Sequence, residues 1–187
     1  INDKQEKFEV LPKRSRKSKK LRNEFNMKLK INDQIPNTDI FHLIDGEPKQ
    51  NKLSEILGNG KIILFGLPGA FTSTCSKLHL PGFVANANKI KEKGIENIFC
   101  ISVNDPYVMN AWGDANNTED KIKMLSDPYL LFTKAIGAEV DRNSKGMGIR
   151  SNRYAMVIEN LEVLKIQVEK ETKQCGLTSA ESILEIL

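Results

Sequence analysis

Short apolar runs recur along the chain and are the first indication of its strands. They are bounded by glycine or polar residues, which is typical of strands buried in a sheet. An extended entry segment or hairpin precedes them, with Asp45-Gly46 as a turn signal. A late pair of strands is predicted to form a hairpin that turns at Asn160-Leu161. The predicted extended segments are residues 33–44, 61–66, 98–103, 122–125, 154–159 and 162–168.

Between these runs, apolar residues recur at helical spacing. The clearest pattern is that of Leu78, Phe83, Ala87 and Ile90. It predicts a helix that starts around Cys75, is kinked or interrupted by Pro81 and is closed by Gly94. Further helices are predicted at residues 53–57, 105–112, 131–136 and 179–187, with Asp105 and Ser179 as candidate N-caps. Residues 141–152 are polar and contain glycine, which predicts a loop.

The alternation of strands and helices predicts one α/β domain with a mixed central sheet. A chain of 187 residues suits one such domain with an appendage. Residues 1–30 hold 11 Lys/Arg and 4 Asp/Glu, a balance of +7, so residues 31–187 carry −3 of the net +4. We therefore divide the chain into a basic, flexible N-terminal tail (residues 1–26) and a slightly acidic domain (residues 27–187).

The tail contains the charge run KRSRKSKK at residues 13–20, which has no apolar periodicity. This pattern indicates a solvated segment, which is also compatible with the end of an organelle-targeting peptide. A patch that binds nucleic acid or an acidic membrane surface is disfavoured, because no aromatic residues for base stacking are interleaved. The acidic balance of the domain argues against nucleic acid as well.

Composition argues against several classes of protein. No apolar run is long enough to cross a membrane, and no apolar core of a secretory signal is visible near the start. Three cysteines without CxxC spacing argue against a disulfide scaffold and a zinc site, and the presence of only two histidines argues against a His-based triad. Free thiols fit a reducing compartment, either cytoplasm or an organelle matrix. No metal or other cofactor is expected.

The most informative stretch is residues 67–84, LPGAFTSTCSKLHLPGFV. It places Cys75 between the end of a buried strand and the start of a helix, where the helix dipole favours the nucleophilic thiolate. Thr72 precedes Cys75 by three residues, so its hydroxyl is expected near the sulfur or an incoming oxygen. Pro68 can shield the site without adding an N–H donor, and Gly69 permits close backbone approach.

This stretch resembles the active-site signature of peroxiredoxins, Pro68-x-x-x-Thr72-x-x-Cys75. The longer form, which continues to Pro81-Gly82-Phe83, resembles the peroxiredoxin 5 or type II branch. Ser73 departs from the pattern, since many members carry proline there. The resemblance covers roughly residues 30–187 and includes the blocks CISVNDP (100–106), Val108-Met109 with Ala111-Trp112, and RSNRY (150–154).

The resemblance implies a thioredoxin-like fold, a mixed sheet with helices on both faces. It implies a thiol-dependent peroxidase that reduces hydrogen peroxide and small alkyl hydroperoxides, in antioxidant defence and redox homeostasis. Cys75 is the implied peroxidatic cysteine, and Thr72 is implied to hydrogen-bond the thiolate and the peroxide. Arg153 matches the family's active-site arginine, with Arg150 as the second candidate, and Pro68 is implied to shield the site.

The resemblance leaves the reduction of the oxidised sulfur open. Animal members use a resolving cysteine in the loop before the last helix, and Cys175 lies in that loop, a few residues before the family's position. Cys100 matches a second cysteine of plant-like members, but its apolar strand favours a buried core thiol. Without a resolving cysteine, glutathione or a glutaredoxin would reduce Cys75; with one, a thioredoxin-type donor is expected.

Several alternatives stay open. His79, one turn after Cys75, is expected to be a packed or hydrogen-bonded helix residue, although it is placed to tune the thiolate. Trp112 and Phe71 are expected in the core or in a subunit contact, since family analogy implies a homodimer. The chief alternative function is a peroxide-sensing redox module, which need not turn over with a reductant.

Overall fold

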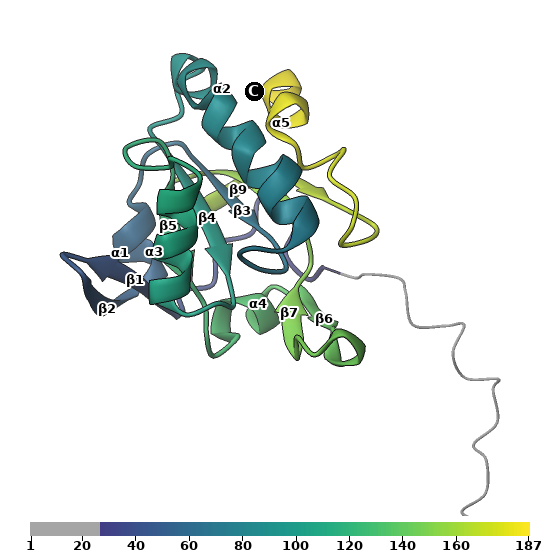
Figure 1. Ribbon diagram of the computed structural model, residues 1–187. Helices are drawn as coiled ribbons and strands as arrows, with labels where there is room; N and C mark the ends of the chain where they lie inside the picture. Colours follow the sequence, from purple (N-terminus) through teal and green to yellow (C-terminus); the bar gives the residue numbers. More distant parts are fainter. Residues whose placement is uncertain (1–26) are drawn as a thin grey trace, which may run out of the picture.

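The computed structural model describes residues 27–187, which form a central sheet flanked by helices (Figure 1). The expected tail, residues 1–26, lies outside the described residues. Within them, seven strands form the main sheet in the order β2-β1-β5-β4-β3-β8-β9. These strands are β1 (Asp39–Ile44), β2 (Glu47–Lys52), β3 (Ile62–Gly66), β4 (Asn97–Ser102), β5 (Lys123–Ser126), β8 (Tyr154–Glu159) and β9 (Glu162–Val168).

The sheet is mixed, as the sequence predicts. β3, β4 and β5 run parallel, whereas β8 pairs antiparallel with β3, and β1 antiparallel with β5. All five residues of β3 are buried, because the strand lies inside the sheet with helices over both faces. The hairpin of β8 and β9 turns where predicted, with Asn160 and Leu161 both at positive φ (51° and 63°).

Within residues 27–187, five α-helices cover the two faces of the sheet (Figure 1). α2 (Leu80–Glu92), α3 (Pro106–Ala115) and α5 (Ala180–Ile186) bury apolar side chains against one face. α1 (Leu53–Leu57) and α4 (Leu131–Ala135) pack against the other face, together with the segment that leads into β1. The expected thioredoxin-like arrangement, with helices on both faces, is confirmed.

The helix that follows the active-site loop differs from the prediction. It opens with a π-helical segment, Cys75–His79, and passes without a break into α2, where Pro81 occupies the second position. Proline has no N–H to continue the π-helical hydrogen bonds, so Pro81 marks the change of helix type, and the chain stays helical on both sides of it. The wider π turn also shifts the buried face: His79 is fully buried, whereas Leu78, predicted with the apolar face, is 60% exposed.

The prediction of a loop at residues 141–152 is wrong in part. A short second sheet forms there from β6 (Glu139–Asp141) and β7 (Ile149–Ser151), which pair antiparallel around a 3₁₀ turn, Asn143–Lys145. The strands have only three residues each, too few for a visible alternation of apolar and polar residues. This hairpin carries Arg142, Lys145 and Arg150 toward the active-site loop.

Candidate active site

Cys75 lies just beyond the carboxyl end of β3, where the chain turns from the active-site loop into the π-helical segment. Its side chain is fully buried, and its sulfur accepts a hydrogen bond of 3.2 Å from Nη2 of Arg153. The first turn of a helix also presents unsatisfied N–H groups with a partial positive charge. The guanidinium and the helix end therefore both direct positive charge at this sulfur.

Arg153 lies immediately before β8 and is 1% exposed. Its Nη2 and Nε groups donate to the carbonyl oxygen of Thr172, at 2.8 and 3.3 Å, and its Nη1 group donates to His79 at 2.9 Å. In residues 27–187, no carboxylate lies within ion-pair distance of Arg153. Its hydrogen-bond partners are the Thr172 carbonyl, His79 and the Cys75 sulfur, so no carboxylate offsets the positive charge that faces Cys75.

His79 hydrogen-bonds the same guanidinium at its Nη1 group. Because arginine only donates, Nδ1 of His79 must accept, so the ring proton is on Nε2 and is donated to the carbonyl oxygen of Thr178 at 3.0 Å. Burial and the neighbouring Arg153 charge lower the pKa of His79 to about 3, although the Thr178 carbonyl acts to raise it. The imidazole is therefore neutral at physiological pH. It also packs against Phe65 and Phe83.

The sequence indicated that His79 is packed or hydrogen-bonded, but it did not show the partner. The spacing of one turn after Cys75 was the available signal. The partner Arg153 lies 74 residues further along the chain, and only the fold brings the two together. The contact of His79 with Arg153 is thus the feature of this site that pattern analysis missed.

The active-site loop is held by its own hydrogen bonds. The hydroxyl of Thr72 donates to the carbonyl oxygen of Gly69 at 2.7 Å, and the N–H of Ala70 donates to Oδ1 of Asn104 at 2.8 Å. A Cβ on Gly69 would lie 2.9 Å from Nη1 of Arg150 and 3.2 Å from Oδ1 of Asn104, so only glycine fits without displacing them. The loop thus has a defined shape around the buried sulfur.

The two candidate arginines have different surroundings. Arg150 donates through Nε to the carbonyl oxygen of Met147 at 2.8 Å and through Nη1 to that of Pro68 at 3.5 Å. Within residues 27–187, the hydrogen bond to the Cys75 sulfur comes from Arg153. Arg150 therefore contacts the backbone of the active-site loop at Pro68.

The other two cysteines differ in their exposure. Cys100 is fully buried in β4, between β3 and β5, and burial, with the nearby Cys75, raises its pKa well above the usual value although Arg153 acts to lower it. Cys175 is partly exposed in the loop between β9 and α5. Burial also raises the pKa of Cys175, against an opposing effect of Arg153.

A pocket of about 230 Å³ opens at the active-site loop, lined by Pro68, Thr72 and Arg153 among others. The fold thus brings three of the sequence-predicted site residues to one cavity. Cys75 itself is fully buried and does not line this cavity, but Arg153 does, and it donates a hydrogen bond to the Cys75 sulfur. The cationic side chains of Arg142, Lys145 and Lys173 also line the cavity.

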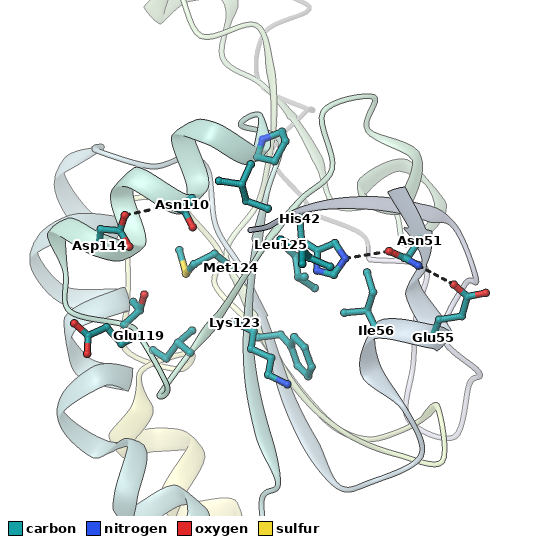
Figure 2. Close-up of a pocket in the computed structure, with 16 residues that line it drawn as sticks. His42, Asn51, Glu55, Ile56, Asn110, Asp114, Glu119, Lys123, Met124 and Leu125 are labelled. Atoms are coloured by element: carbon teal, nitrogen blue, oxygen red, sulfur yellow. Dashed lines mark hydrogen bonds between the residues drawn. The ribbon is translucent and has the colours of Figure 1, made fainter. Parts of the chain in front are cut away.

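A larger pocket of about 570 Å³ lies between α1, α3 and the strands β1 and β5. Figure 2 shows that polar side chains of this pocket pair with one another: His42 with Asn51, and Asn51 with Glu55. On the opposite wall Asn110 donates to Asp114. Among the described residues that line it there is no cysteine, so they supply no nucleophilic sulfur.

The fold and the site define a thiol-dependent redox enzyme with the architecture of the thioredoxin-like superfamily, and comparison with known proteins specifies the family. Residues 30–184 match the Redoxin family. The chain is 41% identical over 159 residues to Peroxiredoxin-2C of Oryza sativa subsp. japonica, a match that covers 84% of this chain and 97% of that protein. The chain therefore belongs to the peroxiredoxin family, and it is a thiol peroxidase.

Solved structures agree with this assignment. The reduced Prx3 of Vibrio vulnificus in complex with hydrogen peroxide superimposes with a TM-score of 0.80 at 40% identity, covering 84% of this chain and 98% of that one. The antioxidant protein of Plasmodium falciparum, a 1-Cys peroxiredoxin, gives a TM-score of 0.77 at 31% identity, with the same coverage. The predicted family and fold are thus confirmed. In residues 27–187, no helix is both long and apolar enough to span a membrane.

Proposed function

We propose that Cys75 is the peroxidatic cysteine and that Arg153 is the group that activates it. The observation that carries this proposal is the 3.2 Å hydrogen bond from Nη2 of Arg153 to the sulfur. A buried cation without a carboxylate partner stabilises an adjacent anion far more than an exposed one does. The same cation is in place for the negative charge that develops on the departing oxygen.

The reaction we propose is a displacement at oxygen. The Cys75 thiolate attacks the terminal oxygen of ROOH, the S–O bond forms and the O–O bond breaks. The electron pair of that bond leaves on RO⁻, which takes a proton from water to give ROH. The sulfur ends as the sulfenic acid Cys75–SOH, oxidised by two electrons, and the peroxide is reduced by two.

Thr72 and Pro68 are proposed to position the peroxide and exclude water. The Thr72 hydroxyl donates its hydrogen bond to the Gly69 carbonyl. The lone pairs of the hydroxyl oxygen are therefore free to accept a hydrogen bond from the O–H of a bound peroxide. Pro68 lines the same pocket and adds no competing N–H donor. Arg150, through its contact with the Pro68 carbonyl, is proposed to support the loop.

For the return to the thiol, Cys175 is the candidate resolving residue. Its thiol would attack Cys75–SOH, form a disulfide and release water. The loop that carries it contacts the site through the Thr172 and Thr178 carbonyls, so a movement of this loop would alter the hydrogen bonds of Arg153 and His79. A cysteine on a partly exposed loop can make such a movement more readily than Cys100, whose strand is paired on both sides.

If Cys175 does not resolve, an external thiol takes its place. R′SH then condenses with Cys75–SOH to a mixed disulfide and water, and a second R′SH releases Cys75 as R′SSR′ forms. We propose glutathione or a glutaredoxin for that route and a thioredoxin-type donor for the disulfide route. The 1-Cys name of the Plasmodium falciparum relative supports the first route.

We further propose that the protein is a homodimer. Three large apolar side chains near the active site are exposed: Phe71 (62%), Leu78 (60%) and Tyr107 (56%). Phe71 belongs to the active-site loop, Leu78 to the π-helical segment and Tyr107 to the first turn of α3. If these side chains form one surface, an apolar patch of this kind is typical of a face that a partner covers. For Phe71, the alternative of a core position is wrong, while Trp112 is fully buried.

The N-terminal residues and the compartment complete the proposal. We infer that residues 1–26 are a basic tail outside the catalytic domain, since the family match begins at residue 30. For the compartment we propose either the cytoplasm or an organelle matrix, both of which are reducing. Relatives of this chain include proteins named chloroplastic and mitochondrial, which supports the organelle alternative.

The test is oxidation of the reduced protein by one equivalent of hydrogen peroxide without another thiol. Intact and peptide mass spectra, a sulfenic-acid trap and a Cys75→Ser control identify the product. Rapid oxidation at Cys75 that ends as a Cys75–Cys175 disulfide supports internal resolution, and a trapped sulfenic acid supports an external thiol. If Cys75 reacts no faster than a free thiol, or the serine variant consumes peroxide equally well, the proposed role of Cys75 is wrong.

Turnover separates catalysis from signalling. Repeated cycles with excess thiol and peroxide are expected of a peroxidase. Oxidation that stops after one equivalent with every thiol donor tried would favour the sensing module.

A further inference from the structure

The pocket at the active-site loop, which shares Arg153 with Cys75, has an unusual charge. Among the described residues that line it, the ionisable ones are all cations, Arg142, Lys145, Arg153 and Lys173, with no carboxylate. Residues 31–187 as a whole are slightly acidic, so this concentration of positive charge is local. Hydrogen peroxide is neutral and does not need it.

Two of these cations already have partners. Arg153 is bound to Cys75, His79 and the Thr172 carbonyl, and Lys173 forms an ion pair with Glu171 at 3.0 Å. For Arg142 and Lys145, no carboxylate of residues 27–187 lies within ion-pair distance. These two side chains are the uncompensated charge of the pocket.

Arg142 is the more informative of the two. Its Nε atom is buried and has no hydrogen-bond partner within residues 27–187. A buried donor without an acceptor is costly, and native structures rarely retain one without a reason. The backbone of Arg142 is held, since its N–H donates to Gly148 at 2.8 Å and its carbonyl accepts from Lys145 at 2.9 Å. An acceptor from outside the domain would satisfy this side chain.

We infer that Arg142, with Lys145, binds the carboxylate of an anionic substrate that reacts at Cys75. Arginine pairs with carboxylates through two parallel hydrogen bonds, which suits a half-buried guanidinium with unused donors. The carboxylate takes no part in the chemistry. It holds the molecule while its hydroperoxide or thiol group reaches the sulfur, and the displacement follows the balance given above. This inference rests on the proposed function and adds the substrate class.

The pocket also predicts how such a substrate arrives. Unpaired cations around a concave site attract an anion over the Debye length, which grows as the salt concentration falls. They therefore raise the association rate of an anion at low ionic strength. A neutral substrate of the same shape gains nothing from them. The ratio of rates for an anionic and a neutral substrate of equal reactivity therefore measures the subsite.

The experiment compares matched pairs of reagents. The oxidant arm measures oxidation of reduced protein by tert-butyl hydroperoxide and by 3-hydroperoxy-3-methylbutanoate, which adds a carboxylate to one methyl group. The reductant arm measures reduction of Cys75–SOH by 2-mercaptoethanol and by 3-mercaptopropionate. The variants are Arg142→Gln and Lys145→Gln. Lys93→Gln, at the far end of α2, removes the same charge outside the pocket.

The measured quantity is the rate with the anionic reagent divided by the rate with the neutral one. Relative to the wild type, we expect this ratio to be about fivefold lower in Arg142→Gln, less reduced in Lys145→Gln and unchanged in Lys93→Gln. Raising the ionic strength from about 20 mM to about 500 mM is expected to lower the wild-type ratio toward that of Arg142→Gln. A fall in the oxidant arm assigns the carboxylate to the hydroperoxide, and a fall in the reductant arm alone assigns it to the thiol. The Lys145→Gln variant serves as the test if Arg142→Gln does not fold.

The inference is overturned if neither ratio changes in either pocket variant, or if Lys93→Gln lowers the ratio as much. Failure of the proposed function looks different. In that case the wild-type Cys75 is oxidised slowly by hydrogen peroxide itself, whatever the ratios are.

Discussion

Nη1 of Arg153 lies 2.9 Å from Nδ1 of His79, while Nη2 of the same guanidinium lies 3.2 Å from the sulfur of Cys75. A neutral histidine thus holds the cation that faces the reactive thiol. A protonated imidazole at this position would repel the guanidinium, which after burial is the second cause of the low pKa of His79. His79 is a positioning residue in the proposed mechanism, because it acts on the peroxide through Arg153.

Two substitutions of His79 separate its two hydrogen bonds. The variant His79→Asn places an amide oxygen near the position of Nδ1 and keeps an acceptor for Arg153. The variant His79→Gln instead places an amide nitrogen near Nε2 and keeps a donor for the Thr178 carbonyl. We expect His79→Gln to lower the rate constant with hydrogen peroxide about tenfold and His79→Asn to lower it less, since a hydrogen bond to a charged group contributes roughly 1.5–3 kcal/mol.

Alkylation by iodoacetamide provides the control for this pair. That reaction displaces iodide and develops no oxyanion for Arg153 to stabilise, so the peroxide rate should fall more than the alkylation rate in His79→Gln. Equal losses in both reactions would indicate a general disturbance of the site and would contradict the positioning role.

The stability of the fold is expected to fall on acidification because of His79. Its pKa is about 3 in the folded protein against an ordinary value of 6.5, so below about pH 6.5 the unfolded chain binds a proton that the folded protein does not. The contribution of the neutral His79 to the free energy of unfolding is fully present above pH 6.5 and is lost as the pH falls toward 3. Urea unfolding between pH 7 and pH 4 should show a loss of about 1 kcal/mol per pH unit from this group.

The variant His79→Asn is the comparison for this pH dependence, because asparagine does not titrate. The difference in unfolding free energy between wild type and variant should shrink as the pH falls. A difference that is constant over this range would show that His79 is not the titrating group.

The two arginines should differ in their effect on catalysis. Arg153→Gln removes the donor to the Cys75 sulfur, and we expect the rate constant with hydrogen peroxide to fall by about 10²–10³, as when one donor to a developing oxyanion is lost. Arg150→Gln removes only contacts with the Met147 and Pro68 carbonyls and is expected to cost about tenfold or less. Stopped-flow fluorescence of Trp112, whose indole donates to Ser76 next to Cys75, can follow both. A larger loss in Arg150→Gln would reverse the assignment.

Cys100 is expected to be inert in the folded protein. Full burial raises its pKa well above the usual value, so almost no thiolate is present near neutral pH. Timed alkylation followed by peptide mass spectrometry should label Cys75 first and Cys100 only after unfolding. Cys100→Ala should leave the rate of peroxide reduction within about twofold while it lowers stability by about 1 kcal/mol through the lost packing. Labelling of Cys100 at the rate of Cys75 would contradict this.

Gly66 is expected to tolerate no side chain. A Cβ at this end of β3 would overlap the buried ring of Tyr154, its cross-strand partner in β8. Gly66→Ala should therefore destabilise the fold by about 1–3 kcal/mol, as overpacked cores do, and should shift the neighbouring Arg153. Thermal unfolding measures the first effect and the peroxide rate the second. Gly82→Ala is the control, because the nearest atom to its added Cβ is 3.9 Å away.

Local patterns were sufficient for much of the fold. The buried strand β3 is visible as an unbroken apolar run, and its hydrophobicity follows from burial on both faces. The predicted cap Asp105 is confirmed, since its carboxylate accepts the N–H of Val108 at the start of α3. The hairpin of β6 and β7 escaped detection because its strands are too short to show a period. The exposure of Leu78 escaped detection because a π turn does not follow the 3.6-residue period.

The class of chemistry can be read from the chain alone: a cysteine at a strand–loop–helix junction, in a signature that resembles peroxiredoxins, within an α/β pattern that follows a basic N-terminal segment. Which groups act on that cysteine depends on the folded arrangement. Arg153 and His79 meet across 74 residues of chain, and Arg153 reaches the sulfur across 78. Such contacts depend on how β8, the π-helical segment and the loop after β9 pack together, and a periodic pattern records only which face of an element is buried, not which distant side chain it meets.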